Sequence, residues 1–382
     1  MRTRTISAVL AALLLLGLSA FLTAAAHHGT APDGDYRPRH VPKWHLGGSD
    51  AGQRRLAMLR RAQWRVSPDD AGVLVNPAPP MADFAGGISD CRFLNAPPSG
   101  TTAKFSCVVN GGTVIKVKYG RNPEIHGEVA GTRLLRALGF PADEVAIVPS
   151  LRCYGCPRDP FVTLLTGSWT STREWLGPAG FDDGYTDFTW VSIERRFPAP
   201  AIETDTAEGW AWWEVLRATD HRADLDALRL LAVFLAHWDN KTENQRLVCL
   251  DGPPPSDPAP DCARPLGMIQ DLGGTFGPTK VNIGRWATLP VWDDLATCRV
   301  TMRALPWGGG TFPDVQISEA GRRELADRLT ALTDDQLRDL FRAARFPEFQ
   351  AATDDARDLR EWVDVFKDRV RQVTSAGPCP DS

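Results

Sequence analysis

The stretch His237-Trp238-Asp239-Asn240-Lys241-Thr242-Glu243-Asn244 decides how this chain is interpreted. Its histidine, aspartate and asparagine follow the spacing His-x-Asp-x-x-x-x-Asn, and a second acidic motif, Asp271-Leu272-Gly273, comes after it. A carboxylate such as that of Asp239 can accept a proton from a hydroxyl group. An amide and a carboxylate, as at Asn244 and Asp271, supply the oxygen ligands that Mg²⁺ prefers. The ordered pair of motifs indicates a site that holds a metal ion and activates a hydroxyl group.

Each of these residues also has an ordinary structural interpretation. Asp239 could cap the backbone at the end of a helix, and Asp271-Leu272-Gly273-Gly274 could form a β-turn. The presence of all three oxygen-bearing side chains in this order favours the functional interpretation. In that interpretation Asp239 is the catalytic base, and Asn244 and Asp271 are metal ligands.

The residues on either side of these motifs predict helices. Residues 224–237 are apolar almost all round, which is typical of a helix buried among other elements. Thr333 and Gln336 form a capping box at the start of a later helix. Helices are expected at 318–332, 334–344 and 355–373. The second half of the chain should therefore be mainly helical.

The first half predicts a sheet with one helix. Asn110-Gly111-Gly112 lies between two β-rich runs, which is a hairpin signal. A helix with an apolar face should run over residues 123–138, because Gly139 follows it and ends it. The strands expected around these features are 91–94, 104–109, 113–119, 145–149 and 160–165. The fold class predicted for the whole chain is α+β.

Two lysines and two glutamates of this half are candidate binding residues. Lys116 and Lys118 stand two apart on one expected strand, so both side chains point to the same face. The chain has only seven lysines, and either of these two amines could grip the phosphates of a nucleotide while the other is solvated. Glu124 and Glu128 are four apart on the following helix. Either could pair with the phosphate-binding lysine, or both could simply favour the start of the helix.

The N-terminus has the features of an export signal. Two arginines precede an apolar run over residues 6–26, which ends in Ala24-Ala25-Ala26, the small residues that a signal peptidase needs. We therefore expect a signal peptide over 1–26, which could instead stay uncleaved as a membrane anchor. A polar, irregular leader is expected over 27–85.

The cysteines agree with export to a secreted or periplasmic location. All eight lie beyond the apolar run, and an even number in an exported chain indicates disulfides. Cys153-Tyr154-Gly155-Cys156 could also be a redox pair or half of a zinc site. Sequence cannot fix the connectivity. Neighbours in sequence suggest the pairs Cys91–Cys107, Cys153–Cys156, Cys249–Cys262 and Cys298–Cys379.

The charge pattern narrows the range of partners. The net charge is −4 at pH 7, and the sequence has no basic block or basic stripe with interleaved aromatics. Nucleic-acid binding is therefore not expected. Contact with a membrane is expected only through the N-terminal segment, if that segment stays uncleaved.

On these motifs the chain resembles the protein-kinase-like superfamily, nearer to its atypical and exported branches than to ordinary Ser/Thr kinases. The resemblance covers about residues 91–345. Residues 117–120, Glu128 and 134–139 are also similar to an uncharacterised bacterial family with a kinase-like pattern. In that family the lysine before an aromatic-glycine pair is the fixed one, so the resemblance favours Lys118 and Glu128 over the alternatives.

The resemblance implies a bilobal protein-kinase-like fold. A small β-rich N-lobe with one helix would span residues 86–168, and a larger, mainly helical C-lobe would span 169–382. It also implies ATP between the lobes, with Mg²⁺ or Mn²⁺. The sequence departs from the pattern at Trp238, which replaces an arginine, and in the loop 99–102, which has one glycine where GxGxxG is usual. No Ala-Pro-Glu follows Asp271, and the gap from Asn244 to Asp271 is long.

This interpretation leads to three candidate functions. The first is an exported phosphotransferase that moves the γ-phosphoryl group of ATP to a hydroxyl group of an unknown acceptor, which could be a protein, a glycan or a small molecule. The second is a catalytically silent, kinase-like binding or scaffold protein of the cell envelope, because ATP is scarce outside the inner membrane. The third is a hydrolase or a metal-dependent envelope enzyme on an unrelated fold, for which no Gly-x-Ser-x-Gly or His-Glu-x-x-His motif is present.

Overall fold

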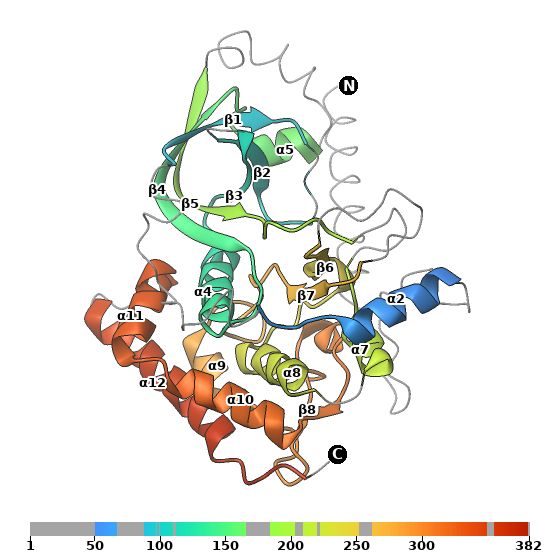
Figure 1. Ribbon diagram of the computed structural model, residues 1–382. Helices are drawn as coiled ribbons and strands as arrows, with labels where there is room; N and C mark the ends of the chain where they lie inside the picture. Colours follow the sequence, from blue (N-terminus) through green and yellow to red (C-terminus); the bar gives the residue numbers. More distant parts are fainter. Residues whose placement is uncertain are drawn as a thin grey trace, which may run out of the picture. The chain divides into compact units, whose positions relative to one another are not determined.

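The structure of the protein is a computed structural model (Figure 1). The predicted signal peptide, most of the predicted leader, Ser99 and the turn residues 110–111 lie outside the described residues. None of the described helices has the length and apolar character needed to cross a lipid bilayer. The described residues are 50–66, 88–96, 98, 100–109, 112–165, 184–202, 209–219, 222–251, 262–349 and 355–380.

The chain mixes strands and helices. The described strands are β1 (Asp90–Leu94), β2 (Lys104–Val108), β3 (Val114–Lys118), β4 (Glu144–Tyr154), β5 (Tyr185–Arg195), β6 (Gln245–Cys249), β7 (Pro265–Ile269), β8 (Arg299–Val300) and β9 (Val315–Gln316). The described α-helices are α2 (Asp50–Arg61), α4 (Pro123–Ala137), α5 (Pro160–Leu165), α7 (Trp212–Ala218), α8 (Ala223–Leu235), α9 (Ile283–Thr288), α10 (Glu319–Thr330), α11 (Asp334–Ala343) and α12 (Asp355–Thr374). Short 3₁₀ turns lie at η4 (Thr242–Asn244), η5 (Pro306–Gly309) and η6 (Phe346–Phe349).

Five strands form a closed barrel in the order β1-β2-β3-β5-β4 (Figure 1). β3 pairs antiparallel with β2 on one side and with β5 on the other. Because side chains alternate along a strand, each strand offers one face to the barrel interior and one to the outside. Phe105, Val117 and Ile193 belong to the apolar cluster of the barrel. The opposite face carries polar residues, among them Lys118, which stands across from Lys104.

Two local predictions for this region were wrong or incomplete. Residues 160–165, predicted as a strand, form the helix α5. A six-residue apolar run does not distinguish a strand from a short helix, and here Pro160 begins the helix while the Asp159 side chain accepts a hydrogen bond from the Val162 N–H. Proline suits the first helical position because its missing N–H is not needed there. β5, which closes the barrel, was not predicted.

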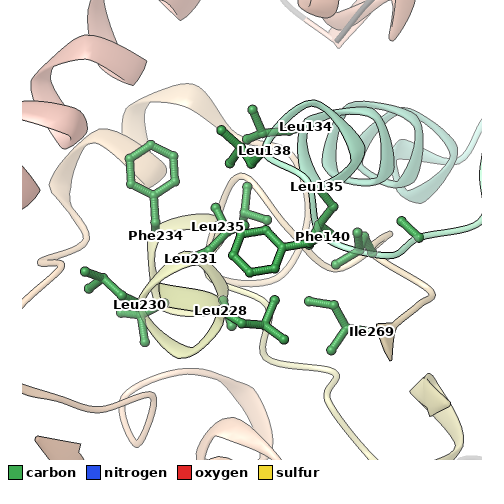
Figure 2. Packing of buried hydrophobic residues seen from close by; sticks show 14 of the residues in the cluster. Leu134, Leu135, Leu138, Phe140, Leu228, Leu230, Leu231, Phe234, Leu235 and Ile269 are labelled. Atoms are coloured by element: carbon green, nitrogen blue, oxygen red, sulfur yellow. The ribbon is translucent and has the colours of Figure 1, made fainter. Parts of the chain in front are cut away.

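The helix α4 packs its apolar face against the buried helix α8. Figure 2 shows Leu134 and Leu135 of α4, and Leu138 just after it, close to Leu231 and Leu235 of α8. All five belong to one apolar cluster. The prediction of a buried helix over 224–237 is confirmed. In α8 every residue after Ala223 and Asp224 is buried. This packing fixes α4 relative to the residues that follow α8.

The C-terminal helices agree with the sequence analysis. α10, α11 and α12 begin and end within a few residues of the predicted bounds. The capping box at Thr333 is present, because its hydroxyl accepts from the Gln336 N–H and the Gln336 side chain accepts from the Thr333 N–H. Helix α12 supplies Trp362 and Phe366 to the aromatic cluster that also contains Phe276.

Four disulfides connect all eight cysteines in the pairs that their order in sequence suggested. Disulfides are typical of proteins that fold outside the reducing cytosol. They are therefore consistent with an extracytoplasmic protein. The pairs are Cys91–Cys107, Cys153–Cys156, Cys249–Cys262 and Cys298–Cys379.

Candidate active site around Lys118 and Asp271

A short hairpin carries the two candidate metal ligands to the same place. β6 and β7 pair antiparallel, with Gln245 opposite Ile269. Asn244 comes immediately before β6, and Asp271 comes two residues after β7. The backbone N–H of Gln270 donates to the carbonyl oxygen of Asn244 at 2.8 Å. The hairpin thus places the backbone of Asn244 beside the residue that precedes Asp271.

Lys118, the last residue of β3, lies between two carboxylates. Its Nζ is 2.7 Å from Glu128 Oε1 and 2.8 Å from Asp271 Oδ1. The side chains of Lys118 and Glu128 are 2% and 1% exposed, whereas that of Asp271 is 32% exposed. A barrel strand, the helix α4 and the segment after β7 therefore meet at one amine, and Asp271 is the member of this group that solvent can reach.

The charges of this group depend on burial and pairing. Burial alone would lower the pKa of the Lys118 amine, but Asp271 and Glu128 outweigh burial and hold it above its usual range. Burial alone would raise the pKa of Asp271, but Lys118 and Lys116 hold it far below its usual range. At Glu128 burial prevails over Lys118 and raises the pKa to about 7. At neutral pH Lys118 is cationic and Asp271 is anionic.

Two glycines let α4 approach the segment that carries Asp271. A Cβ on Gly127 would lie 2.8 Å from the carbonyl oxygen of Gly273, and a Cβ on Gly131 would lie 3.0 Å from Leu272 Cβ. Because these glycines are four residues apart, they share one face of the helix. Glu128 is next to Gly127, so this close approach places Glu128 beside the segment that carries Asp271.

Asp271 itself adopts a left-handed backbone conformation, with φ of 55°. Aspartate tolerates this region better than most residues other than glycine. Such conformations persist only where the surrounding structure holds them, and they gather at functional sites. In this chain the ion pair with Lys118 holds the side chain of Asp271 in place.

Asp239 and Asn244 lie in the loop that follows α8. The Asn244 side-chain amide donates to the backbone carbonyl of Asp239 at 2.6 Å. The Nζ of Lys241 lies 3.5 Å from Asp239 Oδ1. Burial raises the pKa of Asp239 and Lys241 opposes that effect, while the nearby Asp271 raises it further. The two aspartates are therefore close enough for their charges to interact.

Buried polar side chains hold the backbone of the same loop. The amide of Asn240 donates to the carbonyl oxygens of His237 and Gly309 at 2.8 and 2.9 Å. The Gln245 amide donates to the carbonyl oxygen of Asn240 at 3.0 Å. His237 is fully buried, and burial lowers its pKa to about 4. These contacts fix the backbone on both sides of Asp239.

The two alternative candidates have other contact partners, although Lys116 acts on the charge of Asp271 and Glu124 lines the same cavity as Asp239. Lys116 forms an ion pair with Glu194 of β5 instead of with a residue of α4. Glu124 accepts hydrogen bonds from the Thr102 hydroxyl and from the Asn122 amide. Of the two lysines and two glutamates, it is Lys118 and Glu128 that contact each other.

Sequence reasoning missed three residues of this region. A cavity of about 400 Å³ is lined by Asp239, Lys241 and Trp307, among others, and Trp307 is 64% exposed. Lys104 lies on the same face of the barrel as Lys118. The scarcity of lysine was a usable signal, since four of the chain's seven lysines (104, 116, 118 and 241) gather here.

Comparisons with known proteins add little to this geometry. No protein-family model matches the chain, and no curated protein matches it. Among solved structures, the chain is similar to the crystal structure of a proinflammatory kinase of Helicobacter pylori, CtkA, with a TM-score of 0.38 and 10% identity. The match covers 76% of this chain and 94% of that chain. A TM-score this low carries no argument about activity, and the basis for a function is the set of residues at the site.

Proposed function

We propose that the chain is an exported, kinase-like phosphotransferase, which moves the γ-phosphoryl group of ATP to a hydroxyl group of an acceptor. The observation that carries this proposal is the position of Lys118 Nζ, 2.7 Å from Glu128 and 2.8 Å from Asp271. A buried amine held by a helix carboxylate, beside a second and more exposed carboxylate, is the arrangement that phosphoryl transfer uses to hold phosphate groups and a metal ion. In the proposal the barrel forms the smaller lobe and the helices form the larger one.

The donor set near Asp271 suits Mg²⁺ or Mn²⁺. The nitrogen of the Asn244 side-chain amide is engaged by the Asp239 carbonyl, which leaves the amide oxygen for a ligand. Asp271 is ionised and partly exposed. An amide oxygen and a carboxylate are the hard donors that these ions prefer. When bound, the metal ion neutralises charge on the phosphate oxygens.

Asp239 is proposed to accept the proton of the acceptor hydroxyl. It lines the cavity of about 400 Å³ together with Lys241, so an acceptor in that cavity would meet its carboxylate. Burial raises the pKa of Asp239, which makes the carboxylate a better base than an exposed one. Lys241, whose amine lies 3.5 Å away, opposes that effect and favours the ionised form.

Export is a separate part of the proposal. It is supported by the four disulfides and by the signal-like sequence over residues 1–26. The acceptor is proposed only as a hydroxyl-bearing molecule.

The proposal is tested by transfer of labelled phosphoryl groups from [γ-³²P]ATP. The oxidised protein is incubated with Mg²⁺ or Mn²⁺ and with envelope extracts as a source of acceptors. Transfer is expected for the native chain, and loss of at least about 100-fold is expected for Asp239→Asn, the usual range for removing a general base. Asp364→Asn, the same chemical change at an exposed site on α12, should keep full activity. If nucleotide binds but no transfer is found to any acceptor or to the protein itself, the silent binding module is the better description.

A further inference from the structure

The cations on the outer face of the barrel differ in how they are paired. Lys118 has Glu128 and Asp271, and Lys116 has Glu194. Lys104 is the first residue of β2 and stands directly opposite Lys118 across the β2–β3 ladder. Residues opposite each other on neighbouring strands point to the same face, so the amines of Lys104 and Lys118 share one environment.

Lys104 is buried without a direct ion-pair partner among the described residues. The residue is 8% exposed, yet no carboxylate or hydrogen-bond acceptor contacts its amine among the residues that the structure describes. Burying a charge without a partner is costly. Burial lowers the pKa of the Lys104 amine and the adjacent charge of Lys118 lowers it further, and together they outweigh the opposite effect of Asp271 and Glu128. An anion between the two amines would remove this cost.

The amine of Lys104 also lies against the segment that joins β1 to β2. A Cβ built on Gly100 would be 3.4 Å from Lys104 Nζ, and Gly100 has a left-handed backbone with φ of 73°. This segment is where a nucleotide-covering loop would lie, and Gly100 is its one glycine. It offers fewer flexible backbone amides to a phosphate group than a loop with three glycines would.

We propose that Lys104 is a second phosphate-binding amine, which supplies through a side chain the positive charge that this short loop does not supply through backbone amides. The inference rests on the proposed function, since the ligand is the triphosphate of ATP. Lys118 and Lys116 are already matched by three carboxylates. Among the described residues, Lys104 is the lysine of this face that no carboxylate contacts directly, so its amine is open to a ligand. Its role is to bind and orient phosphate groups and involves no bond making.

The first test compares a nucleotide and a nucleoside as ligands of four proteins. Affinities for Mg·ATP and for adenosine are measured by titration calorimetry for the native chain, Lys104→Met, Lys104→Arg and Lys367→Met. Lys367 lies on the exposed face of α12 and is the matched control. Lys104→Met should weaken Mg·ATP binding by about 10- to 100-fold, which is the range for a lost charge-assisted hydrogen bond. Adenosine binding should be unchanged, and Lys104→Arg should keep most of the affinity for Mg·ATP.

The ligand-free proteins give a second readout. Because Lys104 is buried and unpaired, Lys104→Met should melt at the same temperature as the native chain or higher. A charge needed only for structure would instead give a lower melting temperature together with equal losses of ATP and adenosine binding, and that result would overturn the inference.

A measurement on the native chain covers the case in which the variants fail to fold. Lysines are acetylated with a limiting amount of an amine-reactive reagent, and the extent of acetylation at each lysine is measured by mass spectrometry. Saturating Mg·ATP should protect Lys104 and leave Lys367 unchanged. Equal labelling of Lys104 with and without Mg·ATP would overturn the inference.

If Lys104→Met binds Mg·ATP normally while Lys118→Met does not, the role of Lys104 is wrong and the proposed function stands. If the native chain binds neither ligand, both fail.

Discussion

The side-chain amide of Asn244 donates a hydrogen bond to the backbone carbonyl of Asp239 at 2.6 Å. This contact joins the candidate base to a candidate metal ligand within one loop. It also sets the orientation of the Asn244 amide, because the nitrogen is held by the backbone and the oxygen is directed away from it. The loop thereby presents a carboxylate and an amide oxygen from a fixed backbone.

Replacing Asn244 should affect both parts of this arrangement. We expect Asn244→Ala to lower the transfer rate by at least about 100-fold, since it removes a metal ligand and frees the Asp239 backbone. The effect should shrink as the Mg²⁺ concentration is raised, because a missing ligand weakens metal binding. Initial rates over a Mg²⁺ titration measure this. An equal loss at every Mg²⁺ concentration would argue against Asn244 as a ligand.

Lys118 should be important for stability as well as for binding. In Lys118→Met the buried Glu128 loses its partner, and breaking a buried ion pair from one side costs about 3 kcal/mol. The double variant Lys118→Met/Glu128→Gln should recover part of that free energy of unfolding, because no unpaired carboxylate is left in the buried position. Urea unfolding of the single and double variants checks this. The pairing is unimportant if Lys118→Met unfolds like the native chain.

His237 should make the protein sensitive to acid. Its pKa is lowered by burial to about 4 in the folded protein, against about 6.5 when unfolded. Between these values the unfolded chain binds more protons, so stability falls as the pH drops from 6.5 to 4, by up to about 3 kcal/mol. Glu128 acts in the opposite direction, because its raised pKa of about 7 favours the folded state as the pH falls through that value.

The contribution of His237 is therefore measured as a difference. His237→Phe removes the titrating group and keeps a ring of similar size. Unfolding is followed at several pH values between 4 and 7 with EDTA present, so that metal binding does not contribute. The native chain should lose more stability on acidification than the variant does. Parallel pH profiles for the two proteins would show that His237 does not titrate in this range.

The glycines of α4 give a test of how Glu128 is positioned. Gly127→Ala would add a Cβ 2.8 Å from the carbonyl oxygen of Gly273, so α4 would have to move away from the Asp271 segment. We expect transfer to fall at least about tenfold, because small displacements of positioning groups have large effects on rate. Gly284→Ala in α9 is the matched control, since its Cβ would have no neighbour nearer than 4.0 Å. Equal activity of the two variants would mean that α4 does not set the geometry.

Some of this site could be predicted from the sequence, and the reasons why the rest could not are physical. The spacing around Asp239, Asn244 and Asp271 is local, and so was visible without a structure. The choice of Lys118 over Lys116 needed the resemblance, because two residues on one face of a strand are equivalent until their partners are known. The roles of Lys104 and of Gly127 depend on strand register and on helix approach, which a single sequence does not fix.

The secondary structure shows the same limit. The helix over residues 224–237 was predictable because its apolar character extends over several turns. The six residues of α5 were too few to separate a strand from a helix. β5 has polar and apolar residues on alternating faces along part of its length, but it comes after a long stretch without strand signals, so nothing local indicated that it closes the barrel.

Lys118 and Asp271 are proposed to form one site for a metal-bound nucleotide. Calorimetric titration with Mg·ATP tests it most directly, on the native chain, Asp271→Asn and the exposed control Asp364→Asn. We predict saturable binding to the native chain and to Asp364→Asn, with a loss of at least about tenfold in affinity for Asp271→Asn. Binding of the same strength to all three proteins, or to none of them, would contradict the account.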